Sequence, residues 1–267
     1  KEIALTFYSE RSRITFDVFK TDYKNFIDLE FLGNLQVVDQ QIPYPFYQNV
    51  NRDSAKVHGF EINTHLELGD VSESLEGFRL GYKYSRQKGR MSCASNGSNA
   101  NDSNSGCSRG EEVPMNAIQP PTSVYNIGYS TPGDKYGIDL FITDVGAKKR
   151  KDTYNMYWKS QVERTDPYWG HIDASIVNGE PVTDNTKGWR SGDYTVVDVI
   201  AYAKPQKNFN FSLGVYNLTN AKYITWDSAR SIRAFGTVNM IDQATGAGIG
   251  RFYAPRRNFR FNWEVTF

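Results

Sequence analysis

The chain has 267 residues, a net charge of +1 and 39% hydrophobic residues, with 17 Tyr and 16 Phe. This length suits one large all-β domain or two ordinary domains, and the near-neutral charge gives no indication of nucleic-acid binding. No apolar run approaches the roughly 18 residues of a membrane-spanning helix, which leaves a soluble protein or a membrane β-barrel. The chain starts at Lys1 inside a strand-like segment, and we expect it to be a piece of a longer protein.

Apolar residues alternate with polar ones in about nine segments, which predicts about nine antiparallel β-strands. The segments are 2–8, 14–31, 57–68, 77–85, 124–129, 136–142, 193–202, 209–215 and 259–267. In the segment 77–85, one face carries only glycine, cationic and hydroxyl side chains. Such a face would make a poor core for a soluble protein.

The connections between these segments alternate between short and long. Short turns fall near residues 10, 70, 133 and 206, and long polar segments near residues 38, 105, 170 and 238. The loop near residue 38 is expected to cover 33–45, and the turn near residue 206 to cover 204–208. Outer-membrane barrels are built with short turns at one end and long loops at the other, whereas a soluble β-sandwich has no need to sort its loops. Bacterial single-chain barrels have an even number of strands, so the remaining strands are expected upstream.

The last nine residues form an amphipathic strand. Its apolar residues, on every second position, are Phe259, Phe261, Trp263, Val265 and Phe267. A strand that faces lipid on one side and a wet lumen on the other has this pattern. On these residues alone, a closing strand of a soluble β-sandwich is the alternative.

Several motifs together resemble the C-terminal barrel segment of TonB-dependent outer-membrane receptors. They are Val57-His58-Gly59-Phe60-Glu61, Pro120-Pro121 before alternating aromatics, 194–198, 215–223 and the terminal Phe267. A narrower resemblance, to the hemoglobin, transferrin and lactoferrin receptor branch, lies in 225–233, 235–237 and 251–255. The hemoglobin and hemoglobin–haptoglobin receptors are the most similar group in these motifs. Arg256 departs from the family pattern, in which a glycine follows Ala-Pro.

The resemblance implies that residues 1–267 are the C-terminal part of a 22-stranded transmembrane β-barrel, with the plug domain and earlier strands upstream. It implies a receptor in the outer membrane of a Gram-negative bacterium that contacts outer-membrane lipid and is energised by the TonB complex. Such a receptor binds host hemoglobin or hemoglobin–haptoglobin and imports heme iron. Heme would then be a transported ligand, and this segment would hold no cofactor. The terminal aromatic strand is similar to the signal that the barrel-assembly machinery recognises.

Two alternatives to this function stay open. A receptor of the same fold could take transferrin, lactoferrin or a siderophore instead. A soluble all-β carbohydrate-binding or hydrolytic protein is the second alternative. We expect no enzyme, because the sequence has no serine-centred elbow and no metal-ligand spacing. His58 falls on the expected lipid face and His65 on the lumen face, so neither is an obvious heme ligand, and His171 lies in a long loop.

The long segments contain the remaining candidate residues. Cys93 and Cys107 lie in a Ser/Asn/Gly-rich segment, where a disulfide is favoured over a metal site, which needs more ligands, and two free thiols are the alternative. Exposed loop aromatics are suited to gripping a protein partner, although they could instead pack together and brace the loop. The candidates are Tyr157, Trp158, Tyr168, Trp169 and Trp189. The cationic run 148–151 is expected to be a solvated strand end, with pairing to lipopolysaccharide phosphates or an acidic partner as the alternative.

Overall fold

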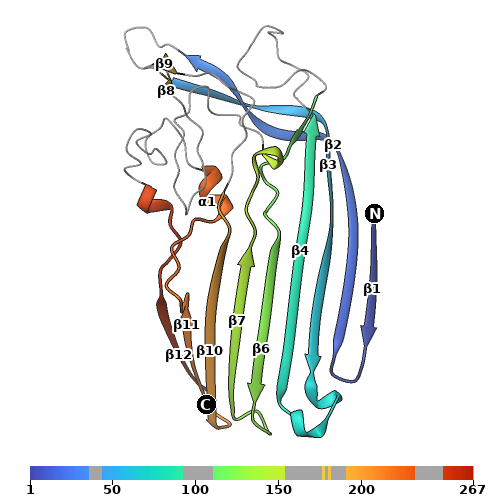
Figure 1. The fold of residues 1–267 in the computed structure, drawn as a ribbon, viewed down its shortest axis with the longest axis vertical. Coiled ribbons are helices and arrows are strands. Elements are labelled where there is room, and N and C mark those ends of the chain that lie inside the picture. The colour runs from blue at the N-terminus through green and yellow to red at the C-terminus, as the bar shows by residue number, and fades with distance from the viewer. Residues whose placement is uncertain are drawn as a thin grey trace.

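The computed structural model describes residues 1–35, 44–92, 111–153, 176–177, 180–181, 191–231 and 249–266. Its main element is one antiparallel sheet in which nine strands follow each other in the order β1-β2-β3-β4-β6-β7-β10-β11-β12 (Figure 1). Strand order equals chain order, so the sheet is a meander. Each of the nine predicted segments corresponds to one of these strands, which confirms the predicted all-β fold. Among the described residues no helix is long and apolar enough to cross a membrane.

The elements have the following bounds. The strands of the meander are β1 (Glu2–Tyr8), β2 (Arg13–Leu35), β3 (Tyr44–Glu67), β4 (Phe78–Ser92), β6 (Thr122–Ser130), β7 (Tyr136–Val145), β10 (Tyr194–Gln206), β11 (Phe209–Tyr216) and β12 (Asn258–Val265). Outside it lie β5 (Glu112–Pro114), which pairs with β4, and the pair β8 (Ile176–Val177) and β9 (Glu180–Pro181). The helices are α1 (Trp226–Ser231) and the 3-10 turns η1 (Leu68–Asp70), η2 (Glu73–Leu75), η3 (Arg150–Asp152) and η4 (Ile249–Phe252).

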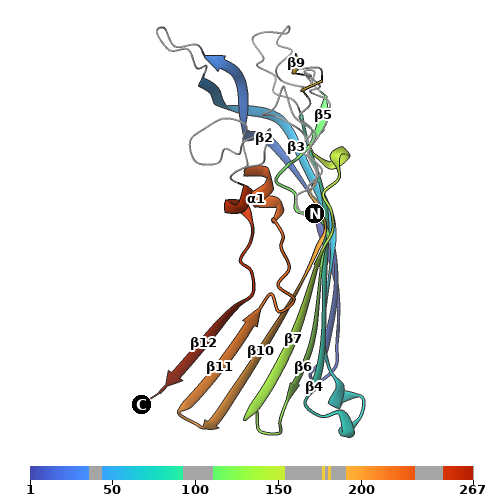
Figure 2. The same ribbon diagram turned by 60° about the vertical axis from the view of Figure 1, so that its left-hand side comes forward.

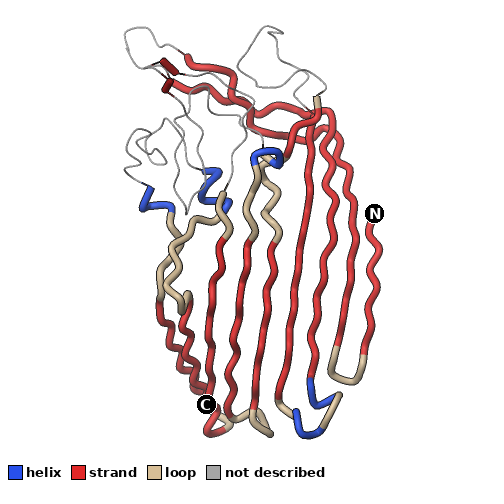
Figure 3. Tube along the Cα trace, viewed as in Figure 1, coloured by secondary structure: helices blue, strands red, loops and turns tan. Residues whose placement is uncertain are grey.

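The connections are sorted by length between the two ends of the sheet, as predicted. The turns after β1, β3, β6 and β10 lie at one end, which we call the short-turn end, and the long connections lie at the other, the long-loop end (Figure 3). Several predicted boundaries were wrong. The strand predicted at 57–68 begins at Tyr44, and the strand predicted at 77–85 continues to Ser92. Strand pairing continues to Leu35 opposite Tyr44, so the loop predicted at 33–45 is shorter, and Gln206 still pairs with Phe209, which reduces the turn predicted at 204–208.

The cross-strand register brings like side chains together on each face of the sheet. Leu5 lies opposite Phe16, Phe16 opposite Ile62, and Ile62 opposite Tyr84, and the same face continues through β6 to β12. We call it the apolar face, and its exposed large side chains include Leu5, Phe7, Phe16, Leu80, Ile127, Ile138, Leu213, Phe259, Phe261 and Trp263. Phe261 is 65% exposed and Trp263 59% exposed, so this face has no protein core against it among the described residues. The sheet itself is curved (Figure 2).

The opposite, polar face carries its own interactions. Asp139 of β7 accepts hydrogen bonds from Arg79 of β4, at 2.7 Å to Nη2, and from Asn126 of β6, at 3.1 Å. The ion pair crosses over β6 at Gly128, where any β-carbon would collide with both partners. Charge on this face is therefore paired across strands, and glycine makes room for the pair.

At the short-turn end, one cluster joins the turn after β1 to the turn after β3. Asp70 accepts hydrogen bonds from the hydroxyls of Ser9 at 2.6 Å and Ser12 at 2.8 Å, and from Arg11 Nε at 2.9 Å. The same guanidinium donates two further hydrogen bonds to Glu76, at 2.6 and 3.0 Å. The hydrogen bonds from Ser9, Ser12 and Arg11 hold the pKa of Asp70 far below its usual range.

This cluster predicts a pH-dependent contribution to stability. An acid whose pKa falls on folding stabilises the fold above its unfolded pKa of about 3.9, and this contribution is lost as the pH falls toward the folded value. Asp70→Asn is therefore expected to lower the urea midpoint of the full-length barrel at pH 7, and the difference from wild type should shrink as the pH falls below about 4. Glu73→Gln, at an exposed neighbour, is the control. An Asp70→Asn difference that is the same at pH 7 and pH 2 would contradict the prediction.

Candidate functional site at the long-loop end

The segment 115–119, which follows β5, packs against β3 and β4 at the long-loop end. Met115 N donates to Gly89 O at 3.0 Å, and a β-carbon at Gly89 would lie only 2.6 Å from Ile118 Cγ1, so glycine lets this segment approach the strand. Its apolar side chains enclose a small buried cluster. The members are Ala55, Met91, Val113, Met115 and Ile118, with Phe26 and Val57 packed against them. The loop between β4 and β6 is thus fixed to the sheet before it reaches β6.

Helix α1, from the connection between β11 and β12, docks on this same segment. Trp226 is 2% exposed and its indole N–H donates to Asn116 O at 2.6 Å, while Gln119 donates to Asp227 at 3.0 Å. A buried indole needs such a partner, because an unpaired donor would cost free energy. Thr225 caps the helix, since its hydroxyl accepts from Ser228 N at 3.3 Å. Figure 2 shows α1 next to the long-loop end of the meander.

Lys148, which follows β7, completes the cluster. Its side chain is buried, its ammonium donates to Ile118 O, and Nζ lies 5.5 Å from the ring centroid of Trp226. Burial lowers the pKa of Lys148 to about 8, with Asp152 raising the pKa and Arg230 lowering it. The prediction that 148–151 is a solvated strand end was wrong for Lys148. Its ammonium group contacts Ile118 and Trp226, which belong to two other connections.

The bases of two long connections are closed by hydrogen bonds. Ser191 N donates to Lys148 O at 3.0 Å, which joins the two ends of the connection between β7 and β10. Asn217 does the same between β11 and β12, because its side chain bonds Ala221 in both directions and also donates to Pro255 O at 3.2 Å. Asn217 has a positive φ of 52°, which asparagine tolerates better than most residues. We call Lys148, Ser191 and Asn217 the loop clamps.

Two tyrosines stack close to the connection that Asn217 holds. Tyr194 and Tyr223 have ring centroids 4.3 Å apart at an interplanar angle of 25°, and Ala254 N donates to Tyr223 O at 3.0 Å. Burial, followed by the charge of Asp198, raises the pKa of Tyr223. The connection between β11 and β12 therefore leaves and rejoins the sheet in fixed positions.

The residues predicted for partner binding lie outside the described residues. This holds for Tyr157, Trp158, Tyr168, Trp169 and Trp189, for Cys93 and Cys107 with their predicted disulfide, and for His171 and Phe267. Phe259, Phe261 and Trp263 are exposed on the apolar face of β12, which ends at Val265. His58 is exposed on the apolar face, and His65 on the polar face lies 3.0 Å from Glu67. No group of His, Cys, Asp and Glu able to hold a metal occurs in the described parts of the chain.

Sequence reasoning missed the residues that hold the loops. Lys148 was read only as part of a cationic run, and Trp226 only as part of a family motif. Asn217 also lies in such a motif, 215–223, and its position right after a strand could have identified it as a clamp. Met115 and Ile118 follow a low-complexity segment and have no local pattern.

The sequence and the fold were compared with those of known proteins. Residues 1–218 match the TonB dependent receptor-like β-barrel family, and the chain belongs to this family. It is 50% identical to "Probable hemoglobin and hemoglobin-haptoglobin-binding protein 1" of Haemophilus influenzae and 47% identical to "Hemoglobin and hemoglobin-haptoglobin-binding protein" of Haemophilus ducreyi. Both matches cover 100% of this chain and 26% of the relative, so the chain spans about a quarter of their length.

Solved structures show the same fold at low sequence identity. The copper transporter OprC matches with a TM-score of 0.59 at 13% identity, over 100% of this chain and 30% of that chain. The FrpB iron transporter of Neisseria meningitidis matches with a TM-score of 0.57 at 15% identity, over 100% of this chain and 31% of that chain. At these identities the comparison shows the fold alone.

The buried lysine predicts a second pH effect, at the opposite end of the sheet. A base whose pKa falls on folding is disfavoured in its charged form, so the packing around Lys148 should gain stability as the pH rises from about 8 toward the unfolded value of about 10.4. The gain is at most about 3 kcal/mol. Protease cleavage of the long-loop end of the full-length receptor measures it, with Lys148→Met removing the pH dependence. The exposed Lys149→Met should behave as wild type, and equal pH profiles for all three proteins would refute the assignment.

Proposed function

We propose that the chain is the C-terminal wall of a receptor that binds host hemoglobin or hemoglobin–haptoglobin and imports heme iron in a TonB-dependent manner. Its location is the outer membrane of a Gram-negative bacterium, as for the receptor family to which it belongs. The observation that carries the proposal is 44–50% identity over the whole chain to relatives named for binding these proteins. Heme is the transported ligand in this proposal, and this segment holds no cofactor of its own.

The two faces of the sheet support a barrel wall. The apolar face, with exposed Phe261 and Trp263, is placed against lipid, and the polar face, with the Arg79–Asp139 pair, lines the lumen. The described sheet ends at β1 and β12, each with one unpaired edge. We assign residues 1–267 to the C-terminal part of a 22-stranded barrel whose earlier strands and plug domain lie upstream. The plug would carry the contact with the TonB complex.

The long-loop end is proposed to bind the host protein. Three connections meet on the segment 115–119, and the loop clamps hold the bases of two of them. A fixed base reduces the conformational entropy that the loops lose on binding. In this proposal the aromatic candidates Tyr157, Trp158, Tyr168, Trp169 and Trp189 contact the host protein, and a disulfide between Cys93 and Cys107 restrains its own loop.

Growth on hemoglobin tests the function. Cells whose only heme receptor is the full-length protein should grow with hemoglobin as sole iron source. Trp226→Ala should weaken hemoglobin binding at least tenfold, because removing a buried Trp costs about 3–5 kcal/mol and releases the docked helix. Binding is measured on cells, per copy of inserted receptor.

Tyr136→Ala is the matched control, because this aromatic residue is 52% exposed at the short-turn end. It should bind hemoglobin as wild type does. Growth on transferrin or on a ferric siderophore, without growth on hemoglobin, would contradict hemoglobin as the ligand and favour the alternative. If the full-length chain stays monomeric in buffer without detergent, the protein is not a membrane barrel.

The terminal strand is proposed to carry the barrel-assembly signal, formed by Phe259, Phe261, Trp263, Val265 and Phe267. Deleting Phe267 from the full-length protein should lower its outer-membrane yield more than hemoglobin binding per inserted copy. Quantitative blotting of membrane fractions and binding to intact cells measure the two quantities. An equal loss of binding by correctly inserted protein would show that the strand acts elsewhere.

A further inference from the structure

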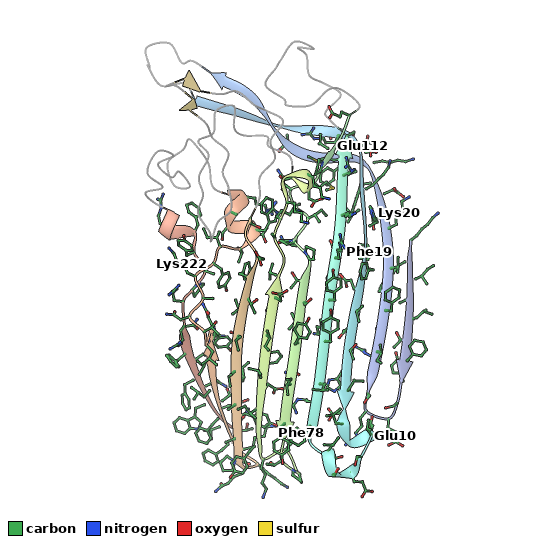
Figure 4. The ribbon with its side chains drawn as sticks, viewed as in Figure 1. Glu10, Phe19, Lys20, Phe78, Glu112 and Lys222 are labelled. Atoms are coloured by element: carbon green, nitrogen blue, oxygen red, sulfur yellow. The ribbon has the colours of Figure 1, made fainter. Side chains whose placement is uncertain are left out.

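The apolar face changes character at one level on strands β2 to β4. On β4, the apolar residues that end at Tyr84 are followed on the same face by Arg86, Lys88 and Arg90. On β3 the same face passes from Phe60 to His58 and Lys56, and on β2 from Val18 to Lys20 and Asp22. Because side chains two positions apart share a face, aromatic and aliphatic side chains give way to cations toward the long-loop end. Figure 4 shows Lys20 toward that end and Phe78 at the other.

The register aligns these cations across neighbouring strands. Lys20 lies opposite His58, and His58 lies opposite Lys88. In the next row, Asp22 lies opposite Lys56, and Lys56 opposite Arg90. Neighbouring strands are about 4.8 Å apart, so each row places its charges within reach of a single phosphorylated head group. All of these side chains are exposed.

The patch has more cations than its own carboxylates can pair. We define the cationic patch as Lys20, Lys56, Arg86, Lys88 and Arg90. Two carboxylates lie beside it, Glu112 at 2.9 Å from Lys56 and Asp22 at 3.9 Å from Lys20. Arg86 and Lys88 have no carboxylate partner among the described residues. The patch thus carries a net positive charge directly beyond the aromatic residues Phe60 and Tyr84.

The patch lies on strands β2 to β4 and does not extend to β6, β7 and β10. On β6, β7 and β10, the residues that follow the apolar run on this face are Ser123, Asp144 and Thr195, which lie opposite one another. None of them is cationic, and Thr195 donates to Asp144 at 2.9 Å. A general preference for cations at strand ends would have placed them here as well. A cluster of cations on adjacent strands therefore occurs on β2 to β4 and not on β6, β7 and β10.

We propose that the cationic patch binds the phosphate groups of the glycolipid that forms the outer leaflet of the membrane. Arginine and lysine pair with phosphate through charge-assisted hydrogen bonds. Aromatic side chains of a membrane barrel lie at the level of the lipid head groups, which places the next two residues of each strand beside the phosphates. The site rests on the proposed placement of the apolar face against lipid. It would hold the lipid against β2 to β4, below the long loops.

Binding of purified lipid A to the full-length receptor in detergent tests the site. The wild type should bind diphosphoryl lipid A at least about tenfold more tightly than lipid A stripped of its phosphates, and added salt should reduce this preference. The triple variant Lys20→Gln, Arg86→Gln, Lys88→Gln should lose the preference. The charge-matched control Arg13→Gln, Lys83→Gln, Lys207→Gln removes three exposed cations from the polar face and a short turn, and it should keep the preference.

Several results would overturn the proposal. They are equal binding of the two lipids by wild type, an unchanged preference in the triple variant, a loss in the control, and displacement of the lipid by an equal concentration of inorganic pyrophosphate. Weaker hemoglobin binding by the triple variant with unchanged lipid binding would assign the patch to the protein partner instead. If the triple variant fails to insert, the wild-type preference and the single variant Lys88→Gln decide the question. If the receptor supports growth on hemoglobin but shows no preference for phosphorylated lipid A, the lipid site is wrong and the proposed function is unaffected.

Discussion

The cross-strand register is the constraint on which the rest of this structure depends. Side chains alternate between faces, so a slip of β3 by one residue against β2 would place Glu61 among the exposed apolar side chains. Pairing is irregular between Phe31 and Gly33 and between Ala203 and Gln206, and both sites lie near strand ends. The apolar rows between them are uninterrupted. A single apolar face across nine strands is the consequence of this regularity.

Regular strands allow the loops to be irregular without losing their bases. Each loop clamp uses polar atoms to fix backbone groups from both arms of a connection, as Asn217 does with Ala221 and Pro255. The segment 115–119 adds a second set of contacts, because the carbonyls of Asn116 and Ile118 accept hydrogen bonds from Trp226 and Lys148 of two other connections. Buried carbonyls need such donors. The segments above this base can therefore change in length and sequence while their points of departure stay fixed.

Much of the fold could be predicted from the sequence because its signal is local. Alternation in segments such as 77–85 indicates strand, face and approximate bounds, and turn residues indicate the short connections. The errors arose where pairing partners decide, as at Leu35 opposite Tyr44. The candidate site was predicted less well. Trp226 and Asn116 are 110 residues apart, so no local pattern indicates that they meet. The aromatic loop residues and the cysteines stay predictions, because they lie outside the described residues.

The two ends of the apolar face differ chemically, and this difference carries information about the surroundings. At the short-turn end the face finishes on rings, with Phe78 against Tyr129 at 4.6 Å and with Trp263 near the end of β12. At the long-loop end of β2 to β4 it finishes on the cationic patch. A symmetric bilayer would place the same demand on both ends. A membrane with phosphorylated glycolipid in one leaflet favours additional cations beyond the aromatic residues at that boundary. The proposed lipid site therefore orients the wall, with the clamped loops on the glycolipid side.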